Sequence, residues 1–442
     1  MLNYYIVNIM IRKIPSFKFN SLLIFIVIFS LGIGVGYGYF KNHQTTTSSS
    51  SPVLKNTPKA FVEEVYDKIK DNYWNNISDA ELLDLFKLSL DKNGGQISIA
   101  KFENKDKLLD SITTATSGMN EEAKLKFLTS VVSSVLSTLQ PVGRSGLYTE
   151  KQEEQLKNTV ANINPEKDLY KDLGLTKGAS ETAIIKAFNE SAQKLSSDSS
   201  KEAKDQLKQL VYAKDTLTEA DKKQRYDQNK AEPTIFNKVI EPNILYVQFK
   251  KFSPTSLDEF QKAFEAYKND SKVNALILDL RGNIGGAIDA TAYFLGFFLG
   301  KNQYAFDFYH KGEYLPFKTP VDKLLALQQY KQMVVLVDQN TQSSAELMAA
   351  SLKRYHTGVV VGVPTKGWGT VERVFPLDNQ ISSNQKYSIF LVHSITLRDD
   401  NQPIEGRGVD PDVNLKSSDW EQRLFDYFRN PELINAIKTV SF

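Results

Sequence analysis

Residues 338–372, DQNTQSSAELMAASLKRYHTGVVVGVPTKGWGTVE, decide the fold of the core. The apolar run Met333–Val337 leads into this stretch, and helical spacing then places the apolar side chains of 347–352 on one face. The pattern predicts a buried strand, a tight turn that carries hydroxyl groups, and a helix. At such a turn Ser343 or Ser344 either only caps the helix or is a nucleophile, because the main-chain N–H groups point outward there and suit a developing oxyanion. This stretch alone leaves both interpretations open.

A second strand, glycine turn and helix precede this stretch. ALILDL (275–280) is a fully apolar run typical of a buried parallel strand, RGNIGG (281–286) follows it, and 287–299 is an apolar helix. Upstream, 244–249 alternates in the manner of a strand, and 256–267 opens as a helix with a Ser-x-x-Glu capping box. The order predicts an α/β layer. The glycines allow a ligand to approach the backbone closely, but their spacing does not fit a dinucleotide fingerprint.

Composition and charge exclude several classes of protein. The chain has 442 residues, enough for two or three domains, and its 41% hydrophobic content is ample for buried cores. Lys plus Arg (54) nearly balances Asp plus Glu (52), so nothing favours nucleic acid. Without cysteine, thiolate chemistry and Cys-ligated zinc are excluded, and the four histidines lie too far apart for a metal site. We expect no cofactor and no metal.

The N-terminal part has the composition of a membrane anchor. Residues 21–40, SLLIFIVIFSLGIGVGYGYF, carry no charge and are long enough to span a bilayer. Basic residues are more numerous before this segment than after it, which predicts a cytoplasmic tail over 1–20 and an extracytoplasmic location for the bulk of the chain. A cleaved signal peptide is the alternative, although no A-x-A site follows. The Ser/Thr-rich stretch 41–58 is expected to be a flexible linker.

Three further regions follow the linker. Residues 59–160 show amphipathic helical spacing with a capping box at Ser78–Glu81, and 164–230 has the pattern of a small helical module. Residues 231–442 form the α/β core, with further strands expected at 359–362 and 387–392.

Four motifs in order carry a resemblance to a known family. ALILDLRGNIGG, NTQSSAELMAASL, VVVGVPTKGWGTVE and IEGRGVDPDV resemble the carboxy-terminal processing (tail-specific) serine peptidases, which have a ClpP/crotonase-like core. Residues 61–86 and 139–154 are similar to the helical N-terminal region of that family. The resemblance implies a multidomain α+β and α/β protein that acts on the C-terminal tails of proteins or peptides. It gives neither the substrate nor the oligomeric state.

The resemblance also implies roles for individual residues. The nucleophile position of the family falls on Ser343, three residues before Glu346. Ser344 would donate one main-chain N–H to the oxyanion, and Gly285 or Gly286 the other.

The position of the family's general base differs in this chain. The catalytic lysine of the family, 25 residues after its serine, falls on Trp368, and a lysine occurs instead at Lys366. The family's glutamine falls on Glu372, which the resemblance places among the catalytic residues with Ser343 and Lys366. If residues 366–368 were an extended strand, positions 366 and 368 would face the same side, about 7 Å apart, and Lys366 could act as a relocated base. Tryptophan cannot accept a proton, so an inactive homologue that binds peptides or serves as a scaffold is the alternative.

Histidine is a weaker candidate for the base. His356 follows the helix after Ser343, and His393 lies in an expected strand. Neither has an obvious orienting carboxylate, so we expect structural roles for both.

The 164–230 module stands where the family usually has a PDZ domain. Its sequence from 169 to 227 is similar to a J domain, but the His-Pro-Asp loop of that module corresponds here to Ser196-Ser197-Asp198. Without the His-Pro pair, stimulation of a DnaK-type chaperone is not expected. A docking or spacer role is the prediction.

Overall fold

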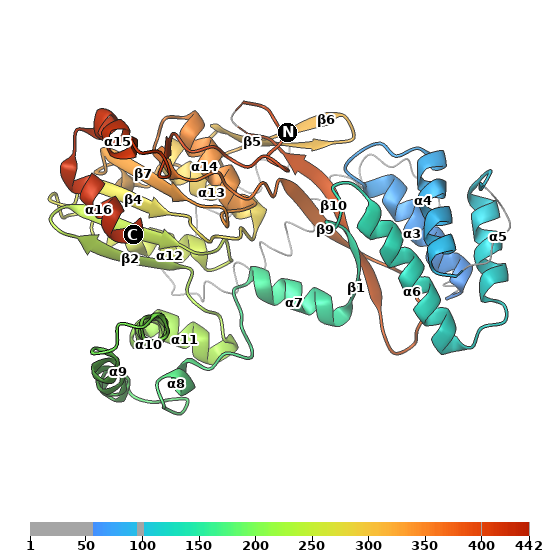
Figure 1. Cartoon of the computed structure of the whole chain (residues 1–442), viewed down its shortest axis with the longest axis horizontal. Coiled ribbons are helices and arrows are strands. Elements are labelled where there is room, and N and C mark those ends of the chain that lie inside the picture. The colour runs from blue at the N-terminus through green and yellow to red at the C-terminus, as the bar shows by residue number, and fades with distance from the viewer. Residues whose placement is uncertain (1–55, 95–100, 399, 442) are drawn as a thin grey trace, which may run out of the picture. The chain divides into compact units, whose positions relative to one another are not determined.

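The structure is a computed structural model that describes residues 56–94, 101–398 and 400–441. It combines helices with two β-sheets (Figure 1), which confirms a mixed α and β architecture. The expected cytoplasmic tail (1–20), the membrane segment (21–40) and most of the linker (41–58) lie outside the described residues. Within the described ranges, no helix combines the length and the apolar character needed to cross a bilayer.

The central sheet forms from the apolar runs that the sequence shows. Its order is β11 (Val413–Asn414), β8 (Val359–Gly362), β7 (Gln332–Val337), β4 (Ala275–Asp279), β3 (Ile244–Phe249) and β2 (Ile235–Ile240). All neighbours are parallel except β2 and β3. Every residue of β4 is buried, as expected for a parallel strand covered on both faces.

Helices cover both faces of this sheet (Figure 1). One face packs against α12 (Ser256–Glu265), α13 (Ile288–Leu299) and α14 (Ser344–Arg354), and the other against α15 (Trp420–Phe428) and α16 (Pro431–Ser441). In such layers the loops at the carboxyl ends of the strands form ligand sites. The loops after β3, β4, β7 and β8 meet at this edge.

A second sheet joins the N-terminal region to the core. Its members are β1 (Gly146–Thr149), β10 (Tyr387–Thr396), β5 (Tyr304–His310), β6 (Glu313–Lys318) and β9 (Thr370–Pro376). The sequence did not predict β1, which pairs with β10 after the loop at 143–146. The helices α3 (Pro58–Asn72), α4 (Asp79–Lys92), α5 (Lys105–Thr116) and α6 (Glu121–Thr138) share one hydrophobic cluster with Ile389 and Leu391 of β10. The polar helix α7 (Glu150–Val160) follows β1.

The 164–230 region has a hydrophobic cluster of its own. It contains α8 (Leu169–Asp172), α9 (Glu181–Leu195), α10 (Lys201–Thr218) and α11 (Ala220–Asn229), packed around Tyr170, Ile184 and Tyr226. The segments that precede and follow this region lie side by side, because Ile163 and Ala231 form an antiparallel bridge and the Glu232 N–H donates to the Asn162 carbonyl at 2.9 Å. The region is therefore an insertion between β1–α7 and β2.

Two local predictions were wrong. Ser256 and Glu259 do not cap α12, because Thr255 is the N-cap residue and both side chains form hydrogen bonds in the interior instead. The capping box at Ser78–Glu81 is confirmed.

The second wrong prediction concerns residues 366–368. They are not an extended strand, since Gly367 has a φ of +78° and β9 begins only at Thr370. Lys366 and Trp368 therefore do not share one face of a strand.

Candidate active site

Ser343 occupies a strained turn between β7 and α14. Its φ of 58° and ψ of −126° lie in a region that residues with a Cβ rarely adopt, at a cost of about 1–3 kcal/mol. Thr341 supports the turn by donating its hydroxyl to the Leu280 carbonyl at 2.9 Å, and the Asp338 carboxylate accepts from the Thr341 N–H at 2.9 Å. A serine on such a strand-to-helix turn presents its hydroxyl outward, as a nucleophile requires.

Glu346 holds this turn from the interior. It is fully buried and accepts the Ser343 N–H at 2.8 Å, the Thr365 hydroxyl at 2.5 Å and the N–H groups of Gly367 (2.7 Å) and Trp368 (2.8 Å). Burial raises the pKa of Glu346, although these four donors oppose that shift. One carboxyl group thus joins the serine turn to the 365–368 loop.

The glycine loop after β4 lies directly against the serine. A Cβ on Gly285 would come within 2.7 Å of the Ser343 Cβ and 3.1 Å of its Oγ, so glycine is required there. The Gly285 N–H donates to the Asn283 Oδ1 at 2.8 Å and is therefore already occupied.

Asn283 is a supporting residue that the sequence did not single out. Its side chain is fully buried and donates Nδ2 to the Phe249 carbonyl at 2.7 Å, while its own carbonyl accepts the Gln342 N–H at 2.9 Å. Asn283 therefore joins the end of β3, the glycine loop and the serine turn. The only sequence signal for this role is the position of Asn283 within the glycine-rich motif RGNIGG.

Gly286 and Ser344 carry the available N–H groups. Phe252 forms a parallel bridge with Gly286, donating to the Gly285 carbonyl at 3.0 Å and accepting the Ala287 N–H at 2.8 Å. In such a bridge the N–H and C=O of Gly286 point away from Phe252, and the Ser344 hydroxyl approaches the Gly286 carbonyl at 3.4 Å. Within the described residues the Gly286 and Ser344 N–H groups have no acceptor.

Lys366 is near the serine turn through its main chain alone. Its N–H donates to the Thr341 carbonyl at 2.9 Å, but its side chain is exposed. No hydrogen bond or ion pair of its ammonium group is found among the described residues. In this conformation the Lys366 side chain is therefore not enclosed by the site.

Trp368, at the expected lysine position, is held between two charged residues. The Arg144 guanidinium carbon lies 3.4 Å from the centroid of the Trp368 ring, and the indole Nε1 donates to the Glu372 carboxylate at 3.2 Å. Arg144 pairs with Glu405 at 2.9 Å, and the other oxygen of Glu405 accepts the Gly369 N–H at 2.8 Å. The loop before β1 and the closing IEGRG segment thus fix this side of the site.

Glu372 is a partly buried carboxyl group beside Trp368. Burial raises its pKa to about 7, while hydrogen bonds from the Thr370 hydroxyl (2.6 Å) and the Trp368 indole, with the Arg144 charge, oppose the shift. A carboxyl group with this pKa exchanges protons near neutral pH.

The two histidines considered as bases lie elsewhere. His356 is exposed after α14, and the buried His393 stacks on His310 with ring centroids 4.3 Å apart. Burial, more than the nearby positive charges, lowers the pKa of His393 to about 3. Within the described residues, no group of three or more His, Asp or Glu side chains could hold a metal ion.

Comparisons with known proteins give a consistent result. Residues 243–415 match the peptidase family described as "Peptidase family S41". The carboxy-terminal processing protease CtpA of Bacillus subtilis is 29% identical over 189 residues, which cover 42% of this chain and 38% of that protein. The tail-specific protease of Haemophilus influenzae is 26% identical over 195 residues, covering 42% of this chain and 27% of that protein.

The matches to these curated relatives span only about a third of their length. Among solved structures, the photosystem II D1 C-terminal processing protease aligns with 20% identity and a TM-score of 0.36, over 42% of this chain and 50% of that chain. A lipoprotein from Streptococcus agalactiae aligns with 12% identity and a TM-score of 0.45, over 86% of this chain and 99% of that chain. The expected resemblance is confirmed by the family match: residues 243–415 match peptidase family S41, and carboxy-terminal processing and tail-specific proteases are among the relatives.

Proposed function

We propose that the chain is a serine endopeptidase that cleaves the C-terminal tails of proteins. The observation that carries this proposal is the turn of Ser343, a strained serine at the start of α14. Beside it lie the N–H groups of Ser344 and Gly286, neither of which has an acceptor among the residues that the structure describes. A helix cap alone gives no reason for a strained backbone. Oriented donors next to a nucleophile are the main source of rate enhancement in acyl transfer.

In this mechanism the Ser343 Oγ attacks the scissile carbonyl. The carbonyl oxygen becomes an oxyanion that accepts the N–H groups of Ser344 and Gly286, and Gly285 serves as the close-packed support rather than the donor. The serine proton passes to the base and then to the leaving amine, and water later hydrolyses the acyl-enzyme.

Lys366 is the proposed base, and it has to move to act. Its main chain donates a hydrogen bond to the serine turn, whereas its side chain is exposed to solvent and has no partner in the described part of the chain. A bound peptide that covers the site would exclude water and favour a neutral amine. Substrate binding is therefore part of assembling the site.

An inactive peptide-binding homologue is the second candidate. Trp368 fills the lysine position and is fixed there by Arg144 and Glu372, and its indole cannot accept the serine proton. In this alternative the same site would hold an extended peptide without cleaving it.

Cleavage of an unstructured protein by the purified full chain separates the two. If the chain is a peptidase, Ser343→Ala and Lys366→Ala should each abolish cleavage. Lys331→Ala is the control and should leave cleavage unchanged, because Lys331 is exposed and directly precedes the first residue of β7, at the end of the strand away from Ser343. Cleavage that survives Ser343→Ala would refute the mechanism. An inert wild type that still binds the peptide would favour the alternative.

For an inert wild type, Trp368→Lys tests whether only the base is missing. Because Arg144 stacks on residue 368 and would repel an ammonium group, the change is made alone and together with Arg144→Ser. Cleavage gained in the double variant would show a functional serine turn.

We further propose that residues 21–40 anchor the chain, with the bulk on the extracytoplasmic side. The support is the uncharged sequence and the basic residues that precede it. Digestion of intact cells stripped of their outer layers by an added protease should degrade the chain. Full protection would refute this orientation.

A further inference from the structure

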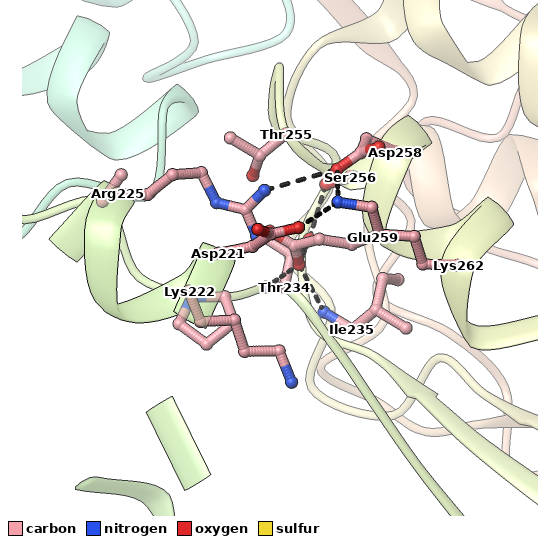
Figure 2. A network of polar contacts seen from close by, with 12 residues as sticks. Asp221, Lys222, Arg225, Thr234, Ile235, Thr255, Ser256, Asp258, Glu259 and Lys262 are labelled. Atoms are coloured by element: carbon pink, nitrogen blue, oxygen red, sulfur yellow. Dashed lines mark hydrogen bonds and ion pairs between the residues drawn. The ribbon is translucent and has the colours of Figure 1, made fainter. Parts of the chain in front are cut away.

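A polar network joins the inserted module to the core (Figure 2). Arg225 of α11 pairs with Glu259 of α12 at 2.9 Å and with Asp258 at 3.4 Å. Lys262 of α12 pairs with Asp258 at 3.0 Å and also with Asp221 of α11. The last helix of the module is thus docked on the first helix of the core.

The contacts of this network differ in strength. The side chains of Lys262 and Asp221 are 55% and 62% exposed, so their pair contributes little. The side chains of Arg225 and Glu259 are only 19% and 4% exposed. Removal of one partner from a buried pair is costly, because the other charge stays buried without compensation.

Glu259 directs this docking into the interior of the core. One carboxylate oxygen accepts from Arg225, and the other accepts the Thr234 N–H (2.7 Å), the Thr234 hydroxyl (3.0 Å) and the Ile235 N–H (3.1 Å). Figure 2 shows Arg225, Thr234 and Ile235 gathered around Glu259. Glu259 therefore fixes the start of β2 against α12.

From Thr234 the contacts continue to the loop after β3. The hydroxyls of Thr234 and Ser256 are 2.7 Å apart, and Ser256 donates to the Lys251 carbonyl at 2.8 Å and accepts the Ser253 N–H at 2.9 Å. All of these side chains are buried. Residues 251 and 253 are therefore held on both sides of Phe252.

Phe252 is the residue whose main chain holds the glycine loop. Its N–H and C=O bind the residues on either side of Gly286, and a Cβ on Gly286 would come within 2.0 Å of the Phe252 oxygen. A displacement of Phe252 therefore turns the Gly286 peptide, including its N–H, which points away from Phe252 like the carbonyl that the Ser344 hydroxyl approaches.

We propose that Glu259 is a positioning residue for the Gly286 oxyanion donor, and that Arg225 keeps it in place when the 164–230 module is docked. The module then sets the geometry of the oxyanion site through Thr234, Ser256 and Phe252. The catalytic consequence rests on the proposed peptidase function. The structural coupling does not depend on it.

Amide hydrogen exchange on the full chain tests the coupling without requiring activity. We compare the wild type with Arg225→Gln, with the conservative Arg225→Lys, and with Lys186→Gln, which removes only an exposed ion pair inside α9. In Arg225→Gln we expect the amides of Phe252 and Ala287 to exchange at least about tenfold faster, because their mutual bridges open more often. Arg225→Lys should restore most of the protection, and Lys186→Gln should match the wild type. Unchanged exchange at Phe252 and Ala287 in Arg225→Gln would overturn the proposal.

The kinetic test applies to the same variants. A displaced oxyanion donor lowers kcat and leaves ground-state binding intact, so Arg225→Gln should lose about tenfold in kcat with KM unchanged. If the chain cleaves nothing but the amides still respond, the peptidase function fails and the coupling stands. If cleavage occurs and neither kcat nor exchange responds, the coupling fails and the peptidase function stands.

Discussion

At the scale of single residues, the site depends on a backbone that its neighbours hold in an unfavourable conformation. Ser343 has a positive φ, and Glu346 accepts its N–H while Gly285 packs against its side chain. A strained turn persists only where surrounding contacts determine it. The residues that keep Ser343 in place therefore matter as much as the serine.

Gly285→Ala should be far more damaging than Gly282→Ala. Both positions have a positive φ, which costs about 1 kcal/mol for alanine, but only at Gly285 would the new Cβ meet the Ser343 Cβ, at 2.7 Å. We expect an additional loss of about 1–3 kcal/mol in unfolding free energy and loss of cleavage for Gly285→Ala alone. Denaturant unfolding and cleavage assays of the two variants check this. Equal effects would contradict the close packing.

The Glu372 carboxyl makes stability depend on pH. Its pKa is raised from 4.5 to about 7 by burial, so between these values the folded chain binds more protons than the unfolded chain. The contribution of this group to the unfolding free energy therefore falls as pH rises from about 4.5 to 7. The glutamine in Glu372→Gln does not ionise, so this variant lacks the loss. We therefore expect the melting temperature of Glu372→Gln minus that of the wild type to increase as pH rises across this window. Parallel curves would show that Glu372 ionises normally.

At the scale of secondary-structure elements, one sequence pattern serves two purposes. Ser78–Glu81 caps α4 as a reciprocal box, whereas Ser256–Glu259, with the same spacing, turns inward and joins α12 to β2 and to the loop after β3. Local sequence cannot separate the two cases, because both residues sit at a helix start. The neighbouring strand and the inserted module supply the partners that decide.

Ser256→Ala should therefore cost more than Ser78→Ala. Loss of an exposed N-cap costs about 1 kcal/mol, whereas loss of the Ser256 hydroxyl leaves the buried Lys251 carbonyl and Ser253 N–H without partners, at about 1–3 kcal/mol each. Chemical denaturation of the two variants measures the difference. A cost for Ser256→Ala no greater than that for Ser78→Ala would mean that the loop rearranges freely.

At the scale of the whole molecule, the N-terminal helices and the core share hydrophobic contacts, while the inserted module has its own cluster. Phe61 of α3 packs edge-to-face on Tyr387 of β10, with ring centroids 6.4 Å apart, inside a cluster that spans both regions. The module connects through the bridge of Ile163 with Ala231 and through the Arg225 network. The first two regions should unfold together.

Replacement of residues 164–230 by a two-residue Asn-Gly turn should leave the rest folded. Ile163 and Ala231 already pair antiparallel, and such a turn closes a hairpin between paired residues. We expect a single cooperative thermal transition and retained secondary structure by circular dichroism, with weaker protection of the glycine loop. Loss of folding would show that the module is required by the core. A matched control, Phe61→Ala, should destabilise the remaining chain by about 3–5 kcal/mol, because it empties a site common to both regions.

Apolar periodicity and motif order by themselves determined the α/β core, the strands at 244–249 and 359–362, the helix after Ser343 and the resemblance to the family that residues 243–415 match. These features depend on the spacing of residues close together in the sequence, which does not depend on tertiary contacts. The tertiary structure alone decided which N–H groups of the site lack an acceptor within the described ranges, and that Asn283 and Phe252 hold the glycine loop. It also decided that Lys366 is exposed while Trp368 lies between Arg144 and Glu372. The physical reason is that these contacts join segments up to 261 residues apart, as Arg144 and Glu405 are, so no local pattern specifies them.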